Sequence, residues 1–74
     1  MVDEILKDLR KYNTSLSREL LFGIKIKLAK MRTSDLEKAY FDGRNQEFGL
    51  HPKIRKEFMY QFAIRGLPSE YIED

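Results

Sequence analysis

The chain has 74 residues, no cysteine and a formal net charge of +2 at pH 7. So short a chain cannot divide its apolar residues between two cores, and we expect a single helical domain over residues 1–74. Early acidic residues and the lack of a long apolar run argue against a secretion signal and a membrane-spanning segment, and the lack of cysteine fits a reducing compartment, so we expect a cytoplasmic protein.

The opening residues have the spacing of an amphipathic helix. Their apolar members are Val2, Ile5, Leu6, Leu9 and Tyr12. Asp3 and Glu4 lie in the expected first turn, where negative charge favours the positive end of the helix dipole. The segment NTSLS that follows contains capping and turn residues, so we expect it to end this helix and begin the next.

The stretch FGIKIKLAKM, residues 22–31, alternates apolar and polar residues as a half-buried strand does. No second alternating run or hairpin turn offers a strand partner. On a helical wheel of about 100° per residue, six of the apolar side chains of residues 16–32 instead fall in one arc of roughly 140°. These are Leu16, Leu20, Leu21, Ile24, Leu28 and Met31. We therefore predict a continuous helix over residues 18–31, in which Gly23 costs about 1 kcal/mol against Ala.

Phe22 and Ile26 lie nearly opposite that arc. We expect them to pack against the first helix or against the C-terminal turn. The alternative is an exposed apolar patch, which would mark a binding site for a protein partner.

The third predicted helix lies in TSDLEKAYFDG, where Ser34 and Glu37 have capping-box spacing and Gly43 is the expected end. Its expected buried residues are Leu36, Ala39 and Tyr40. The segment RNQEFGL then reads as a loop with Phe48 and Leu50 as apolar anchors.

The fourth predicted helix begins at HPK, with Pro52 at the first helical position. Its apolar stripe is Ile54, Phe58 and Phe62. Gly66 suits the left-handed residue that follows a helix, and Pro68 prevents its continuation. Tyr71 and Ile72 belong to a last turn that docks on the core. The predicted fold is a small all-α four-helix bundle with a short C-terminal helical turn.

Residue types for catalysis or metal binding are scarce. His51 is the single histidine and lies between Leu50 and Pro52, away from other ligand-type residues, so we expect it to cap the fourth helix or to pack beside it. The sequence has no glycine-rich phosphate loop and no nucleophile with a base and an orienting group. We predict a protein that is not an enzyme and binds no cofactor or metal.

Basic residues are concentrated in two segments, residues 18–32 and 51–65. The first contributes Arg18, Lys25 and Arg32 in one sector of the wheel, flanked by Lys27 and Lys30. The second contributes Lys53 and Lys56, and the aromatic residue Tyr60 shares their sector opposite the apolar stripe. Because cations neutralise phosphates and a ring stacks on an unstacked base, this set predicts a nucleic-acid-binding surface. The alternative is the solvated surface of ordinary helices.

The length, the order of helices and the richness in lysine, isoleucine, tyrosine and phenylalanine resemble the small protein encoded beside the UvsW helicase of T4-like phages. That resemblance implies a four-helix module similar to the helicase-and-RNase-D C-terminal module of RecQ helicases, which binds structured nucleic acid. It also implies an accessory role in phage DNA replication, recombination or repair, with single-stranded or branched DNA as the ligand and a helicase as a further partner.

Particular segments resemble a second family, the Hha/YmoA nucleoid modulators. ILKDLRKYNTSLSREL is similar to their opening helix and turn, SDLEKAYF to their S-D-x-E helix, DGRNQEF to their D-x-R-x-x-E-L segment and LPSEYI to their closing I-P-x-x-V-W. This resemblance implies, as the alternative function, an adaptor for a nucleoid protein with Asp42 and Arg44 at its protein-binding surface. On either reading we expect a monomer that binds no membrane, in the host cytoplasm if a phage encodes it.

Overall fold

The computed structural model of the chain describes residues 2–46 and 49–67. These residues form four α-helices and no strand. The helices are α1 (Val2–Ser15), α2 (Arg18–Lys30), α3 (Thr33–Asn45) and α4 (Pro52–Ile64). The predicted all-α four-helix fold is confirmed, and the strand-like alternation lies inside α2 as predicted. Phe48, Pro68, Tyr71 and Ile72, and with them the predicted C-terminal turn, lie outside the described residues.

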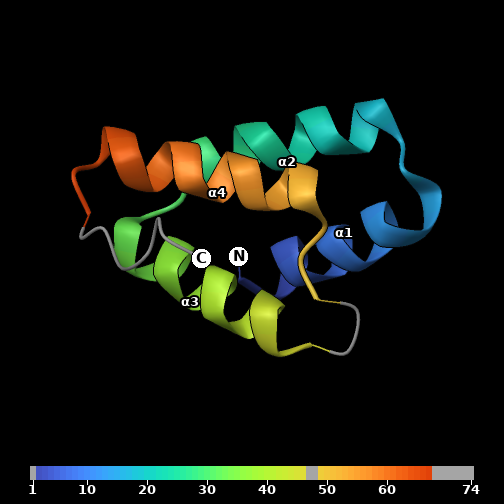
Figure 1. Cartoon of the computed structure of the whole chain (residues 1–74), viewed down its shortest axis with the longest axis horizontal. Coiled ribbons are helices and arrows are strands. Elements are labelled where there is room, and N and C mark those ends of the chain that lie inside the picture. The colour runs from blue at the N-terminus through green and yellow to red at the C-terminus, as the bar shows by residue number, and fades with distance from the viewer. Residues whose placement is uncertain (1, 47–48, 68–74) are drawn as a thin grey trace.

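The helices form two layers (Figure 1). α2 and α4 lie side by side in one layer and run in the same direction, so their C-terminal ends lie at the same end of the molecule. α1 and α3 pack against each other in the second layer, and α1 also packs against α2. The α2–α4 layer therefore has an outer surface on the opposite side of the molecule from α3.

The core lies between the layers and takes apolar side chains from every helix. Its buried members are Ile5, Leu9, Tyr12, Ile24, Leu28, Met31, Leu36, Ala39, Tyr40, Ile54, Phe58 and Phe62. The predicted stripe of α4 is fully buried, and the Tyr40 ring meets the Phe62 ring edge-on, with centroids 5.1 Å apart and planes at 88°. Such edge contacts are favourable because the positive rim of one ring meets the negative face of the other.

The connection between α1 and α2 differs from the prediction at Leu16. This residue was expected in the apolar arc of the second helix, but it has φ 53° and is 55% exposed. Its N–H donates to the Tyr12 carbonyl at 2.8 Å, which closes α1, and the chain turns there in the left-handed conformation. Ser17 then begins α2 as its N-cap, because its hydroxyl accepts the Leu20 N–H at 3.3 Å.

Two predictions for α3 are also wrong. Ser34 and Glu37 do not form a capping box, because the helix begins at Thr33 with Arg32 as the N-cap, and the Leu36 N–H donates to the Arg32 carbonyl at 2.8 Å. Gly43 does not end the helix, which continues to Asn45. Gly43 is buried instead, and a Cβ there would lie 2.8 Å from Cδ2 of Leu50, so its lack of a side chain admits the following loop.

The boundaries of α4 agree with the prediction. Pro52 is at its start, and the His51 Nδ1 accepts the Lys53 N–H at 3.1 Å as an N-cap. The His51 ring also packs edge-on against Tyr12, with centroids 5.1 Å apart. Gly66 has φ 68°, and the Leu67 N–H donates to the Phe62 carbonyl at 3.0 Å, as in a glycine-terminated helix. Within residues 2–46 and 49–67, no helix is long and apolar enough to cross a membrane.

Candidate nucleic-acid interface

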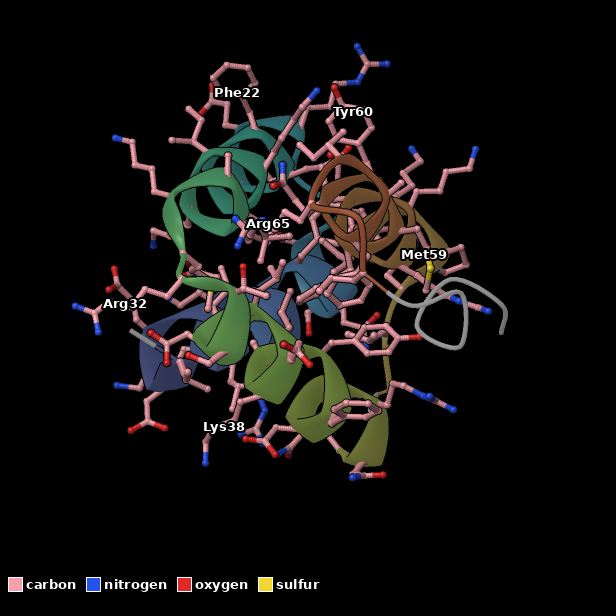
Figure 2. All side chains as sticks on the ribbon, turned by 90° about the vertical axis from the view of Figure 1, so that its left-hand side faces the viewer. Phe22, Arg32, Lys38, Met59, Tyr60 and Arg65 are labelled. Carbon is pink, nitrogen blue, oxygen red and sulfur yellow. The ribbon has the colours of Figure 1, made fainter. Side chains whose placement is uncertain are left out.

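Two aromatic rings stand on the outer surface of the α2–α4 layer. Phe22 projects from α2 and Tyr60 from α4, both toward the same side of the molecule and away from α1 and α3 (Figure 2). Phe22 is 64% exposed and Tyr60 58% exposed. The expectation that Phe22 packs against α1 is therefore wrong, and its other expected partner, the C-terminal turn, lies outside the described residues. Tyr60 lies opposite the buried stripe of α4 as predicted.

Helical spacing places further exposed residues beside these rings. Side chains three, four or seven residues apart share one side of a helix. On this rule Ile26 extends the surface from Phe22, and Ile64 extends it from Tyr60; both are exposed. The same rule adds the exposed cations Arg18, Lys25, Lys53 and Lys56. We call these eight residues the α2–α4 face.

The parallel packing of α2 and α4 thus joins the two basic segments that the sequence separates. Each segment adds two cations and two large apolar side chains to the α2–α4 face. Lys30 is exposed on α2 at the edge of this set. Glu19 and Glu57 precede Phe22 and Tyr60 by three residues, so the same rule places these two acids beside the face; Glu19 is exposed and Glu57 is half-buried. The arrangement can hold a polyanion and offer apolar contact at the same time.

Lys27 is directed to the other side of α2. Its ammonium forms ion pairs with the carboxylates of Glu4, at 3.0 Å, and of Asp8, both on α1. The hydrogen bonds that the Lys27 ammonium donates, to Asp8 first and to Glu4 second, raise the pKa of Lys27 above its ordinary value of 10.5. Its charge is therefore compensated inside the molecule, and Lys27 contributes to α1–α2 packing instead of to the α2–α4 face.

Arg32 does not lie in the predicted basic sector either. The wheel that grouped it with Arg18 and Lys25 assumed one helix through residue 32, but α2 ends at Lys30 and Arg32 is the N-cap of α3. Figure 2 shows its side chain on a different side of the molecule from Phe22 and Tyr60. The prediction that Arg32 shares a sector with Arg18 and Lys25 is wrong, because the chain changes direction at residues 31 and 32.

Asp42 and Arg44 lie on α3, in the other layer. Asp42 is half-buried, whereas Arg44 is exposed with its guanidinium carbon 5.5 Å from the centre of the Tyr40 ring, as in a cation–π contact. These residues therefore belong to a surface separate from the α2–α4 face. In the part of the chain that the structure describes, no three His, Cys, Asp or Glu side chains are grouped so that they could hold a metal ion.

The sequence reasoning did not assign Phe22, Ile26 or Ile64 to this site. The signal for the first two was present, since the wheel put Phe22 and Ile26 opposite the core arc. Ile64 follows Tyr60 by four residues and extends the same side of α4. The sequence could not show that, among the residues that the structure describes, no helix packs on that side of α2.

Comparison of the chain with protein-family models, with curated proteins and with solved structures finds no match. The resemblances to the phage protein and to the nucleoid modulators therefore stay predictions.

Proposed function

We propose that this protein is a non-catalytic nucleic-acid-binding protein that uses the α2–α4 face, and that it acts as an accessory in phage DNA replication, recombination or repair. The observation that carries the proposal is the exposure of Phe22 and Tyr60 among cations from two helices. Cations there neutralise phosphates, and exposed rings offer stacking surfaces to bases. The resemblance to the phage protein supports the cellular role.

The charge of the face sets the expected strength of binding. The face has four cations, with the exposed Glu19 and the half-buried Glu57 nearby, in a chain whose net charge is only +2. Releasing about three counterions predicts a log–log salt slope of about −2 to −3, and hence weak binding that salt reverses. The same cations oppose pairing of this face with a second copy, so we propose a monomer, and we place it in the cytoplasm.

A titration of single-stranded, duplex and branched DNA at two salt concentrations tests the proposal. The variant Lys25→Ala with Lys56→Ala should weaken binding and make the salt slope shallower by about 1 to 2 units. Arg32→Ala with Lys38→Ala is the charge-matched control, because it also removes two cations but from sides of the molecule away from Phe22 and Tyr60 (Figure 2). No binding of any DNA at about 50 mM salt, or equal effects of the two variants, would contradict the proposal.

A second candidate function is that of an adaptor for a nucleoid or transcription-regulating protein. The observation that favours it is the exposed apolar part of the α2–α4 face, since contiguous apolar surface marks many protein-binding sites. The resemblance to the nucleoid modulators instead points to Asp42 and Arg44. This function would be favoured if the wild type binds a purified nucleoid protein but no DNA, and if Asp42→Asn or Arg44→Ala abolishes binding of that protein.

A further inference from the structure

The α2–α4 face has more apolar surface than contact with phosphates alone requires. Phe22, Ile26, Tyr60 and Ile64 are all exposed large hydrophobic residues, and they come from two adjacent helices. A duplex keeps its bases stacked and paired inside, so its outer surface offers phosphates and sugars that gain little from such side chains. An unstacked base has an apolar face that does gain from them.

We infer that the ligand is a single strand, and that Phe22 and Tyr60 each stack on one of its bases. This inference rests on the proposed function and specifies its substrate. It adds Phe22 as a base-contacting residue and makes the binding surface span both helices, with cations of each helix beside its ring.

The register of α2 and α4 supports a joint role of the two rings. Arg65 Nη2 donates to the Leu28 carbonyl oxygen at 3.1 Å and to Gln61 Oε1 at 3.4 Å, so the end of α2 lies beside the last turn of α4. Tyr60 is at that last turn, whereas Phe22 precedes Leu28 by six residues, which is about 9 Å along the helix at about 1.5 Å per residue. The two rings are therefore separated both along the helix pair and across it, where the axes are expected to lie about 8–10 Å apart.

A strand that runs obliquely over the helix pair would pass over one ring and then the other. Lys25 follows Phe22 by three residues and Lys56 precedes Tyr60 by four, so each ring has a cation on its own side of its helix. Phosphates on either side of a stacked base would lie within reach of such cations. Two ring–cation pairs on adjacent helices therefore form a short track for a polyanion with exposed bases.

Charge argues against a second copy of the chain as the occupant, and the leucine variant described below distinguishes an acidic peptide from a single strand. A second copy of the chain would bring the same cations face to face, which is unfavourable. An acidic amphipathic peptide would pair with the cations. Its apolar side chains would pack equally well if Phe22 and Tyr60 were replaced by leucine. Stacking on a base requires the flat aromatic ring itself, so replacement of the rings by leucine separates the two occupants.

The test uses the full chain with a fluorescent oligothymidylate of about 12 nucleotides and a duplex of the same length. Phe22→Leu with Tyr60→Leu should weaken binding of the single strand by at least about fivefold and change binding of the duplex by less than about twofold. Phe22→Tyr with Tyr60→Phe keeps both rings and should bind the single strand as the wild type does. Because both positions are exposed, all variants should keep the wild-type circular dichroism and melting temperature.

Ile26→Ala with Ile64→Ala is the matched control for loss of apolar surface on the same face. It should weaken binding of the single strand less than Phe22→Leu with Tyr60→Leu does. The outcomes separate the inference from the function on which it rests. If neither DNA binds, the proposed function fails. If the single strand binds but the leucine variant binds it as tightly as the wild type, or if single strand and duplex lose affinity equally, the proposed function stands and the stacking role of Phe22 and Tyr60 is overturned.

Discussion

Arg65, which follows α4, donates a hydrogen bond from Nη2 to the main-chain carbonyl oxygen of Leu28 near the end of α2, at 3.1 Å. Its Nη1 donates to the Thr33 hydroxyl at 3.2 Å, at the start of α3. The last carbonyls of a helix lack intrahelical partners and have partial negative charge, so a guanidinium there is favourable. Figure 2 shows Arg65 between α2 and α4. One side chain therefore connects the ends of three helices.

Arg65→Met should lower the free energy of unfolding by about 1.5–3 kcal/mol, because hydrogen bonds from a charged donor are lost. Arg65→Lys keeps the charge but cannot reach Thr33 and Leu28 together, so we expect an intermediate loss. Urea denaturation measures both, and Arg18→Met is the control for an exposed arginine. Stability of Arg65→Met equal to the wild type would mean that these hydrogen bonds do not contribute.

Replacement of Gly23 in α2 by alanine should stabilise the protein, whereas the same replacement of Gly43 in α3 should not. A Cβ at Gly23 would meet nothing within 4 Å, so Gly23→Ala should stabilise the protein by about 0.5–1 kcal/mol through helix propensity. A Cβ at Gly43 would lie 2.8 Å from Leu50 Cδ2 and 3.4 Å from Leu9 Cδ1, so Gly43→Ala must displace Leu50 and should lose that gain. Thermal or urea unfolding of the two variants makes the comparison, and equal stabilisation would show that Leu50 moves at no cost.

The ion pairs of Lys27 should make stability depend on pH at the alkaline end. The pKa of Lys27 is raised in the folded state by its hydrogen bonds to Asp8 and then Glu4, so the stabilisation is present below the ordinary value of 10.5 and is lost as pH rises through the higher folded value. Because Lys27 is partly exposed, we expect Lys27→Met to cost only about 1 kcal/mol at neutral pH.

Unfolding in urea at neutral pH and above about pH 10.5 tests this prediction. The wild type should lose more stability over that interval than Lys27→Met does, since the variant has no ion pair left to lose. Lys30→Met, at an exposed lysine of the same helix, should behave as the wild type. Parallel pH profiles for wild type and Lys27→Met would refute a stabilising role of the pair.

The two contacts of His51 can be separated by substitution. His51→Ala removes both the cap of α4 and the edge contact with Tyr12, and the loss of the cap alone should cost about 1 kcal/mol. Asn also caps helices well, so His51→Asn should restore the capping part and leave the ring contact missing. Melting temperatures should therefore fall in the order wild type, Asn, Ala. An Asn variant no more stable than Ala would mean that the ring contact is what matters.

The sequence by itself determined the helices and their apolar sides. Hydrophobic spacing is a local property, so it identified Ile5, Leu9 and Tyr12 on α1 and the stripe of Ile54 and Phe58 on α4 as core residues. The strand-like stretch in α2 was also resolved correctly, since a helical wheel accounts for both of its apolar sides whereas a strand would have lacked a partner.

Tertiary structure decided where the helices begin and end. Leu16 lies outside α2 because the α1–α2 turn requires a left-handed residue there, and Gly43 lies inside α3 because Leu50 packs against it. A glycine that permits close packing and a glycine that ends a helix read alike in a sequence. The contact that separates the two roles comes from a segment beyond the helix.

Tertiary structure also decided which surface is free to bind. The wheel showed two apolar sides of α2, but only the packing of α1 and α4 against α2 determines that one is buried at Ile24 and the other exposed at Phe22. The parallel packing likewise brings Lys25 and Lys56, far apart in the sequence, to one face, while the break after Lys30 sends Arg32 elsewhere. A helical period fixes the direction of a side chain about its own axis, and the neighbour it meets depends on where the other helices lie.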